Sequence, residues 1–165
     1  MAGDHDYVYG LPETHREQTR GAMHLAKPGC FATCIQLALL PALTAGMLSG
    51  DIHVNGITGS TGAGQKPGAT THYSWRNDNI SVYKTFNHQH LLEINQTVQE
   101  LHPGYDGRVL FIPQRGCFAR GIYVTAYAKC DAPLEEVQKV YADYYQDAAF
   151  THFVVKSPDM KQVVN

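Results

Sequence analysis

The sequence predicts a domain of the α+β class, and three observations lead to this prediction. The chain has 165 residues, which is enough for one domain with its own hydrophobic core. Apolar and polar residues alternate over 121–129, as in a half-buried strand. Segments 30–40 and 133–146 instead carry apolar residues at helical spacing.

The N-terminal segment is expected to contain one short helix. Residues 1–8 are predicted to be a frayed start or linker, and 9–165 to be the domain itself. A helix is predicted over 14–25, because Thr14 followed three residues later by Glu17 forms a capping box.

A second helix is predicted directly after a tight turn. Pro28 and the glycine after it break the preceding element, and residues 32–40 are good helix formers with an apolar stripe. We expect Pro41 to kink this helix and Gly46 or Gly50 to end it.

The middle of the chain is predicted to alternate between strands, a loop and a helix. Residues 51–58 and 80–86 have the alternation of strands. The glycine-rich stretch 58–68 between them cannot form a regular element. A helix is predicted over 91–101, and the sequence His-Pro-Gly at 102–104 ends it.

The C-terminal part is predicted to contain strands at 108–113, 121–129, 150–155 and 162–165. A helix is predicted over 133–146, with a proline in its first turn. Its core-facing residues are expected to be Leu134, Val137, Tyr141 and Tyr144.

Composition excludes several classes of partner. The net charge is −2 and the basic residues are scattered, so we expect neither a nucleic-acid nor a membrane partner. The start of the chain is polar and acidic, unlike a signal peptide, and the apolar run 31–48 is too short and too polar to span a membrane. Four cysteines without a disulfide framework indicate a reducing, cytoplasmic location. No cysteine or histidine spacing predicts a metal site.

Cys30 is the leading candidate for a reactive residue. It begins the helix that follows the Pro-Gly turn, where free backbone N–H groups and the positive end of the helix dipole favour a thiolate. The alternative is a buried, inert thiol, since free cysteine is among the most buried residue types. The position at the helix start favours a nucleophile.

Two histidines are candidate proton acceptors for this thiol. His88 and His90 lie near the start of the 91–101 helix, two residues apart, so both cannot easily face the same group. The helix dipole keeps a histidine in the first turn neutral and fit to act as a base, and His90 fits this position better than His88. The alternative for either is a partly exposed polar residue.

Two further features are candidate ligand contacts. The glycines of 58–68 permit close approach of the backbone to a ligand, although the stretch matches no phosphate-binding motif and a surface turn is the alternative. Arg115 and Arg120 precede the 121–129 strand, where an arginine can bind a carboxylate or phosphate; a surface ion pair is the alternative. Side chains of the types found in recognition sites also follow the loop, and they would line either a ligand site or an oligomer interface. They are His72, Tyr73, Trp75, Arg76 and Tyr83.

A set of motifs in fixed order resembles a known enzyme family. The motifs are YGLPE at 9–13, KPGCFAT at 27–33, GSTGAGQ at 59–65, HQH at 88–90 followed by Glu93-Ile94, and RGI at 120–122. Together they resemble the N-acetyl-γ-glutamyl-phosphate reductases of arginine biosynthesis, which are related to aspartate-semialdehyde and glyceraldehyde-3-phosphate dehydrogenases. The resemblance covers nearly the whole chain.

The resemblance implies a fold and a missing partner domain. Family members have an N-terminal NADP-binding Rossmann domain and a C-terminal catalytic and dimerisation domain, a mixed, largely antiparallel sheet with helices packed on it. The chain resembles only the second domain. We therefore expect a fragment that forms a homodimer or homotetramer, lacks most of the NADP(H) site and is inactive alone.

The resemblance also implies roles for individual residues. Cys30 would attack the acyl-phosphate substrate to form a thioester, and His90, or else His88, would transfer protons. The residues expected to contact the substrate are Arg120, Gln36 and Tyr83. Those expected to lie against the cofactor are Gly59, Ser60, Gly62, Ala63 and Gly64.

One departure and two alternatives remain at this point. Lys27 stands where the family commonly has asparagine, which changes the charge beside the Pro-Gly-Cys turn. One alternative is a dimerisation scaffold without activity of its own. The other is a cysteine hydrolase, although no triad spacing beyond the Cys and His pair is visible.

Overall fold

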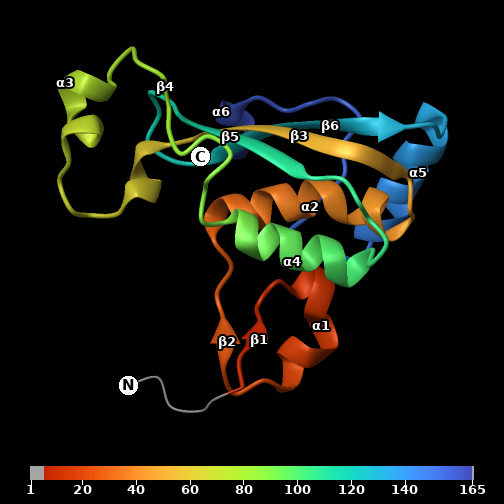
Figure 1. Cartoon of the computed structure of the whole chain (residues 1–165). Helices are drawn as coiled ribbons and strands as arrows, with labels where there is room; N and C mark the ends of the chain where they lie inside the picture. Colours follow the sequence, from red (N-terminus) through yellow and green to blue (C-terminus); the bar gives the residue numbers. More distant parts are fainter. Residues whose placement is uncertain (1–5, 165) are drawn as a thin grey trace.

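The chain folds around a four-stranded sheet with helices packed against one face (Figure 1). The computed structural model describes residues 6–164. The strands follow the spatial order β4-β5-β3-β6 and span Ser81–Val82, Val109–Arg115, Leu48–Thr58 and Ile122–Cys130. β3 pairs parallel with β5 and antiparallel with β6, and β4 pairs antiparallel with β5. This mixed sheet confirms the α+β prediction.

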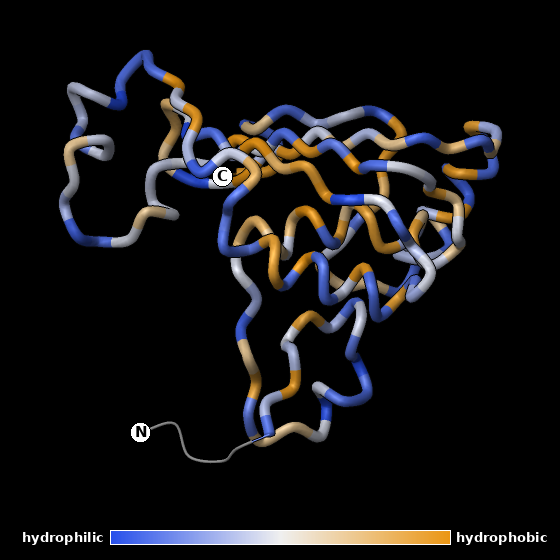
Figure 2. Tube along the Cα trace, viewed as in Figure 1, coloured by the Kyte–Doolittle hydropathy of each residue, from blue (hydrophilic) through white to orange (hydrophobic). Residues whose placement is uncertain are grey.

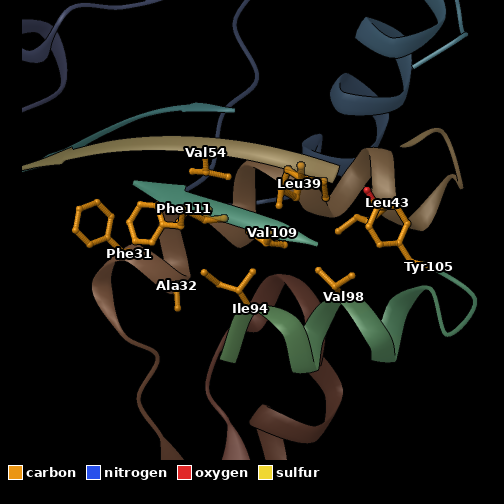
Figure 3. Close-up of a cluster of buried hydrophobic side chains, with 12 residues drawn as sticks. Phe31, Ala32, Leu39, Leu43, Val54, Ile94, Val98, Tyr105, Val109 and Phe111 are labelled. Atoms are coloured by element: carbon orange, nitrogen blue, oxygen red, sulfur yellow. The ribbon is translucent and has the colours of Figure 1, made fainter. Parts of the chain in front are cut away.

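The hydrophobic core lies between the sheet and two helices, α2 (Cys30–Thr44) and α4 (Leu91–Leu101). Ile52 and Val54 on β3 point into it, whereas His53 between them is exposed, which is the alternation the sequence predicts. Figure 2 shows the apolar residues gathered along the sheet–helix interface, and Figure 3 shows the side chains that fill it. A Cβ on Gly56 would lie 2.6 Å from the Phe31 ring, so this glycine permits the close approach of α2 to β3.

The helix α2 begins and ends at signals visible in the sequence. Gly29 is its N-cap and Pro41 lies inside it. At its C-terminal end Gly46 has a φ of +65°, and the N–H of Met47 donates to the Ala42 carbonyl over 2.9 Å, as in a Schellman motif. The expected end at Gly46 is confirmed.

The N-terminal segment differs from its prediction. The helix α1 spans Pro12–Gly21 rather than 14–25, because Pro12, with its fixed φ, occupies the first turn. Thr14 is not the N-cap; its hydroxyl donates to the Leu11 carbonyl over 2.9 Å. The strands β1 (Val8–Tyr9) and β2 (Leu25–Ala26) pair in parallel beside α1. Most of the expected frayed start lies outside the described residues.

A long segment between β3 and β4 protrudes from one end of the sheet (Figure 1). It contains two 3₁₀ turns, η1 (Ser60–Ala63) and η2 (Ala69–Thr71), and the short helix α3 (Tyr73–Arg76). The strand expected over 80–86 is wrong in length, because only β4 pairs with the sheet. Lys84 and Phe86 have positive φ values of 46° and 57°, which end the ladder.

In the C-terminal part, the strands expected at 108–113 and 121–129 and the helix expected at 133–146 are present, whereas the strands expected at 150–155 and 162–165 do not form in the described residues. The helix α5 (Leu134–Tyr145) packs on α2, and its Tyr141 hydroxyl donates to the Ala38 carbonyl over 2.6 Å. Leu134, expected in the core, is 66% exposed. Residues 150–155 pair with no strand of the described chain, and the last strand is replaced by α6 (Met160–Val163), which Asp159 and Gln162 cap reciprocally. Asn165 lies outside the described residues.

Among residues 6–164, none of the helices has the length and apolar character needed to cross a lipid bilayer.

Candidate active site

A cleft of about 360 Å³ opens at the N-terminal end of α2. It brings together side chains from α2, the end of β3, the glycine-rich loop, the segment before α4 and the end of β5. Its lining residues are Cys30, Phe31, Thr58, Gly62, Ala63, Tyr83, Lys84, His88, Gln89, His90 and Arg115. The cleft therefore unites the predicted thiol with both predicted histidines.

Cys30 is the first residue of α2 and its side chain is exposed. The first helical hydrogen bond runs from the Thr33 N–H to the Gly29 carbonyl over 2.8 Å, so the N–H groups of residues 30–32 precede the helical ladder. Cys34, one turn further on, faces the interior, where burial raises the pKa of its thiol to about 11. Only the first of these two thiols opens to the cleft.

His90 packs directly against the turn that carries Cys30. A Cβ placed on Gly29 would lie 2.3 Å from the Nε2 atom of His90. The ring therefore occupies the space that a side chain at position 29 would need, which explains why glycine stands there. Burial lowers the pKa of His90 and so favours its neutral form, whereas the carboxylate of Glu93 acts in the opposite direction.

His88 is held in an aromatic enclosure. Its ring makes edge contacts with Phe31, Tyr83 and Phe111 at centroid distances of 5.6, 5.8 and 5.5 Å. Its Nδ1 accepts the backbone N–H of His90 over 3.2 Å, which places the proton of the neutral ring on Nε2. Burial, together with the neighbouring His90 and Lys84, lowers the pKa of His88 to about 4.

A chain of hydrogen bonds runs behind the cleft. The Glu93 carboxylate accepts the N–H of Gly29 and the hydroxyl of Tyr9, both over 2.9 Å. Gln36 donates to the Tyr9 hydroxyl over 2.8 Å and accepts from Thr97 over 2.7 Å. Gln36, expected to contact substrate, is only 2% exposed and does not line the cleft, because its face of α2 meets α4.

The cleft is also lined by two basic residues to which the resemblance assigned no role. Arg115 ends β5, and its guanidinium carbon lies 5.0 Å from the centre of the Tyr83 ring. Lys84 donates to the Gln89 side chain over 2.9 Å. Tyr83, an expected substrate contact, does line the cleft, and burial raises the pKa of its hydroxyl.

The glycine-rich loop is pinned to the chain that precedes β6. The N–H of Ser60 donates to the Phe118 carbonyl, and that of Thr61 to the Ala119 carbonyl, both over 3.0 Å. A Cβ on Gly59 would lie 2.5 Å from the Ala119 carbonyl oxygen, so this close approach requires glycine. Of the five loop residues expected at the cofactor, Gly62 and Ala63 line the cleft, whereas Gly59, Ser60 and Gly64 do not.

Arg120 lies away from Cys30. It is exposed and lines a separate cavity with the C-terminal helix α6, including Met160 and Lys161. The structure therefore does not place the expected anion-binding residue in the cleft. Arg115, five residues earlier, is there instead. Lys27 is exposed and also lies outside the cleft lining.

The side chains that line the cleft are suited to thiol chemistry. Within residues 6–164, no group of three or more His, Cys, Asp or Glu side chains is arranged to hold a metal ion. The cleft instead offers one exposed thiol, two histidines whose pKa values are lowered by burial, and two basic side chains.

The chain is similar in sequence and in fold to known proteins. The sequence model of the semialdehyde dehydrogenase dimerisation domain matches residues 30–165. The chain is 57% identical over 162 residues to the N-acetyl-gamma-glutamyl-phosphate reductase of Parabacteroides distasonis and 56% identical to that of Bacteroides thetaiotaomicron, covering 98% of this chain and 50% of each relative. The chain thus spans about half the length of these curated relatives. Its fold resembles the crystal structure of aspartate semialdehyde dehydrogenase II from Vibrio cholerae, with a TM-score of 0.60 at 16% identity over 83% of this chain and 49% of that one.

Proposed function

Because the chain belongs to the semialdehyde dehydrogenase dimerisation-domain family, we propose that it is the catalytic and dimerisation half of an N-acyl-γ-glutamyl-phosphate reductase. The substrate would be N-acetyl-L-glutamyl 5-phosphate, and the products its 5-semialdehyde and phosphate. The observation that carries this proposal is the exposed Cys30 at the start of α2 with His90 packed against the preceding residue.

In the first half-reaction, the Cys30 thiolate attacks the acyl carbon of the substrate. The carbon–oxygen bond to the phosphoryl group breaks, inorganic phosphate leaves, and a thioester forms on Cys30. The free N–H groups of residues 30–32 are available to stabilise the developing oxyanion. We assign the proton acceptor to His90, because its ring adjoins Gly29 and burial favours its neutral form. His88, whose Nδ1 is already occupied, would orient His90.

Reduction of the thioester needs a nicotinamide cofactor. Gly62 and Ala63 fit its reactive end, because they present no large side chain to the part of the cleft that holds Cys30. When bound, NADPH supplies the hydride that reduces the thioester. His90 would then return a proton as the semialdehyde leaves Cys30.

We expect residues 1–165 alone not to turn over, because the sequence contains no dinucleotide-binding motif and the relatives are about twice as long. We propose that the other half of the full-length enzyme supplies the rest of the nucleotide site. Sustained NADPH consumption by the 165-residue chain would contradict this. We place the reaction in the cytoplasm, where its thiol nucleophile stays reduced.

The half-reaction at Cys30 can be tested on the chain itself. The chain is mixed with N-acetyl-L-glutamyl 5-phosphate, and phosphate release and the mass of the Cys30 peptide are measured. We expect one acyl group on Cys30 and at most stoichiometric phosphate. Cys30→Ser should abolish both, whereas Cys117→Ser, which removes an exposed thiol outside the cleft, should change neither.

The result also separates the reductase from a scaffold without activity. A folded chain that forms oligomers but acquires no acyl group on Cys30 would support the scaffold and refute the reductase. Continuous hydrolysis of the substrate through Cys30 would support the hydrolase instead.

We further propose that the open face of the sheet packs against a second copy of the chain. α2 and α4 cover the opposite face (Figure 1). On the open face, His53 and Ile57 of β3 lie opposite Tyr127 and Tyr123 of β6, and the two tyrosines are 57% and 42% exposed. Exposed aromatic residues on the uncovered face of a sheet are typical of interface cores.

Sedimentation velocity tests this interface. The double variant Tyr123→Asp/Tyr127→Asp should shift a dimer to a monomer, because it buries two carboxylates in the contact. Tyr73→Asp, on the protruding segment, should leave the dimer intact. An unchanged dimer in the double variant would exclude this face.

A further inference from the structure

Arg115 differs from Arg108 in having no carboxylate partner among the described residues. Its Nε is buried without a hydrogen-bond partner. Arg108, in contrast, pairs with Asp51 over 2.6 Å. The guanidinium of Arg76 donates to the carbonyls of Thr70, Asn79 and Arg115 and to the Ser81 hydroxyl. Within residues 6–164, no ion pair includes Arg115.

The cleft around Arg115 is lined by basic side chains but by no carboxylate. Lys84 is its second basic residue, and none of the side chains that line it is a carboxylate. Arg115 stands over the Tyr83 ring at 5.0 Å, a cation–π contact that orients the guanidinium without neutralising it. A half-buried cation without a carboxylate partner favours an anionic ligand.

The backbone around Arg115 is fixed on both sides. In the parallel ladder, Arg115 lies opposite Thr58 of β3, and the N–H of the next residue, Gly116, donates to the Thr58 carbonyl over 2.9 Å. The Arg115 carbonyl accepts from Arg76 over 2.7 Å. The strand end is therefore rigid, and little order has to be gained when a ligand binds.

We propose that Arg115 is the residue that binds an oxyanion of the ligand at Cys30, either a carboxylate or a phosphoryl group. This inference rests on the proposed function, since it assigns a substrate contact in the same cleft. It gives to Arg115 the role that the resemblance implies for Arg120, whose side chain lies in a separate cavity. The planar fork of an arginine matches either anion with two parallel hydrogen bonds.

Alkylation of Cys30 measures this anion preference without turnover. Iodoacetate and iodoacetamide both form a bond from the Cys30 sulfur to carbon with loss of iodide, but only iodoacetate carries a carboxylate. The ratio of their rates at the Cys30 peptide, measured by mass spectrometry, reports the attraction of a carboxylate and cancels differences in thiolate content. The same peptide in the urea-unfolded chain gives the baseline ratio.

We expect the folded chain to exceed this baseline and Arg115→Gln to lower its ratio roughly three- to tenfold, the net contribution of one hydrogen bond. Arg115→Lys keeps the charge but lacks the planar guanidinium, so its rate ratio should lie between those of the unaltered chain and Arg115→Gln. In a second measurement, inorganic phosphate should slow iodoacetamide modification in the unaltered chain but not in Arg115→Gln. If Arg115→Gln lowers the ratio of the iodoacetate rate to the iodoacetamide rate, Arg115 contacts a carboxylate. If Arg115→Gln abolishes the protection by phosphate, Arg115 contacts a phosphoryl group.

The controls separate Arg115 from charge in general. Arg20→Gln removes an exposed arginine on α1 that pairs with Glu17, and should leave both measurements unchanged. The iodoacetamide rate and the thermal unfolding curve show that each variant is folded. An Arg115→Gln chain that retains both effects, or an Arg120→Gln chain that alone loses them, would overturn the proposal. If the substrate does not acylate Cys30 but the alkylation ratio and the phosphate protection still depend on Arg115, the reductase is refuted and the anion contact of Arg115 is supported.

Discussion

The backbone N–H of Gly29 donates to the carboxylate of Glu93 over 2.9 Å, across 64 positions of sequence. Gly29 is the N-cap of α2, and Glu93 lies in the first turn of α4. The same carboxylate raises the pKa of His90, against the larger effect of burial. One side chain thus fixes the cysteine turn and influences the neighbouring histidine.

Glu93→Ala should destabilise the chain by about 1.5–3 kcal/mol, because a charged hydrogen-bond acceptor is removed from the half-buried Gly29 N–H and Tyr9 hydroxyl. Urea unfolding at pH 7 measures this loss. Glu100→Ala, on the same helix, removes an exposed carboxylate that pairs with His15 and should cost less than about 1 kcal/mol. Equal losses in the two variants would show that Glu93 does not hold the turn.

Gly29→Ala should displace His90 without disturbing the backbone of the turn. Gly29 has a φ of −66° and a ψ of 149°, which alanine adopts freely, but the new Cβ would meet Nε2 of His90 at 2.3 Å. We expect the His90 ring resonances to shift in NMR spectra and Cys30 acylation to fall at least about a hundredfold, the lower end of a general base's contribution.

Gly21→Ala provides the matched control for this substitution. A Cβ there would meet nothing within 4 Å, so the His90 resonances and the acylation rate should not change. Unshifted His90 resonances in Gly29→Ala would show that the ring does not depend on the glycine.

Much of this site could be predicted from local sequence, because its signals are local. The Pro-Gly break before Cys30 and the alternation of β6 act over a few residues and predict a helix start and a strand correctly. Arg115 and Arg120 could not be ranked, because their directions depend on the pairing of the glycine loop with 118–121. Likewise, the face of α2 that carries Gln36 is set by its packing on α4. Phe150 has high strand propensity but finds no partner strand in the described chain and is 95% exposed.

The buried His88 should make stability depend on pH. Its pKa of about 4 in the folded chain lies below the ordinary value of 6.5, so the unfolded chain binds the proton more tightly. Stability should therefore fall as the pH drops from about 6.5 to about 4 and level off below that, with a total loss of about 3 kcal/mol from this group. Urea unfolding between pH 7 and pH 4 measures the slope.

His88→Gln should flatten this slope, since glutamine keeps a hydrogen-bond acceptor but does not titrate. His152→Gln removes an exposed histidine and should leave the slope as it is. A steep slope that survives in His88→Gln would assign the pH dependence to other groups.

Cys34 should stay unmodified when Cys30 reacts. Burial raises the pKa of its thiol to about 11, so almost no thiolate is present at pH 8, and its helix turn faces the interior. Peptide mass spectrometry after brief treatment with iodoacetamide should show alkylation of Cys30 at least about a hundredfold faster than that of Cys34. In urea the two rates should converge. Comparable rates in the folded chain would mean that the start of α2 opens readily.

Arg76→Lys should loosen the protruding segment although the charge is kept. Arg76 is 5% exposed, and its fork ties Thr70 and Asn79 to the end of β5 through the Arg115 carbonyl. A lysine cannot reach several carbonyls at once, and the carbonyls left unpaired cost about 1–3 kcal/mol each. We expect amide hydrogen exchange to accelerate over 68–82 and to remain slow in β3. Lys66→Arg, in the same segment but exposed, should leave exchange unchanged.

Because Arg76 also holds the Arg115 carbonyl, the protection of Cys30 by phosphate should weaken in Arg76→Lys. Full protection combined with fast exchange would show that the segment moves independently of the cleft.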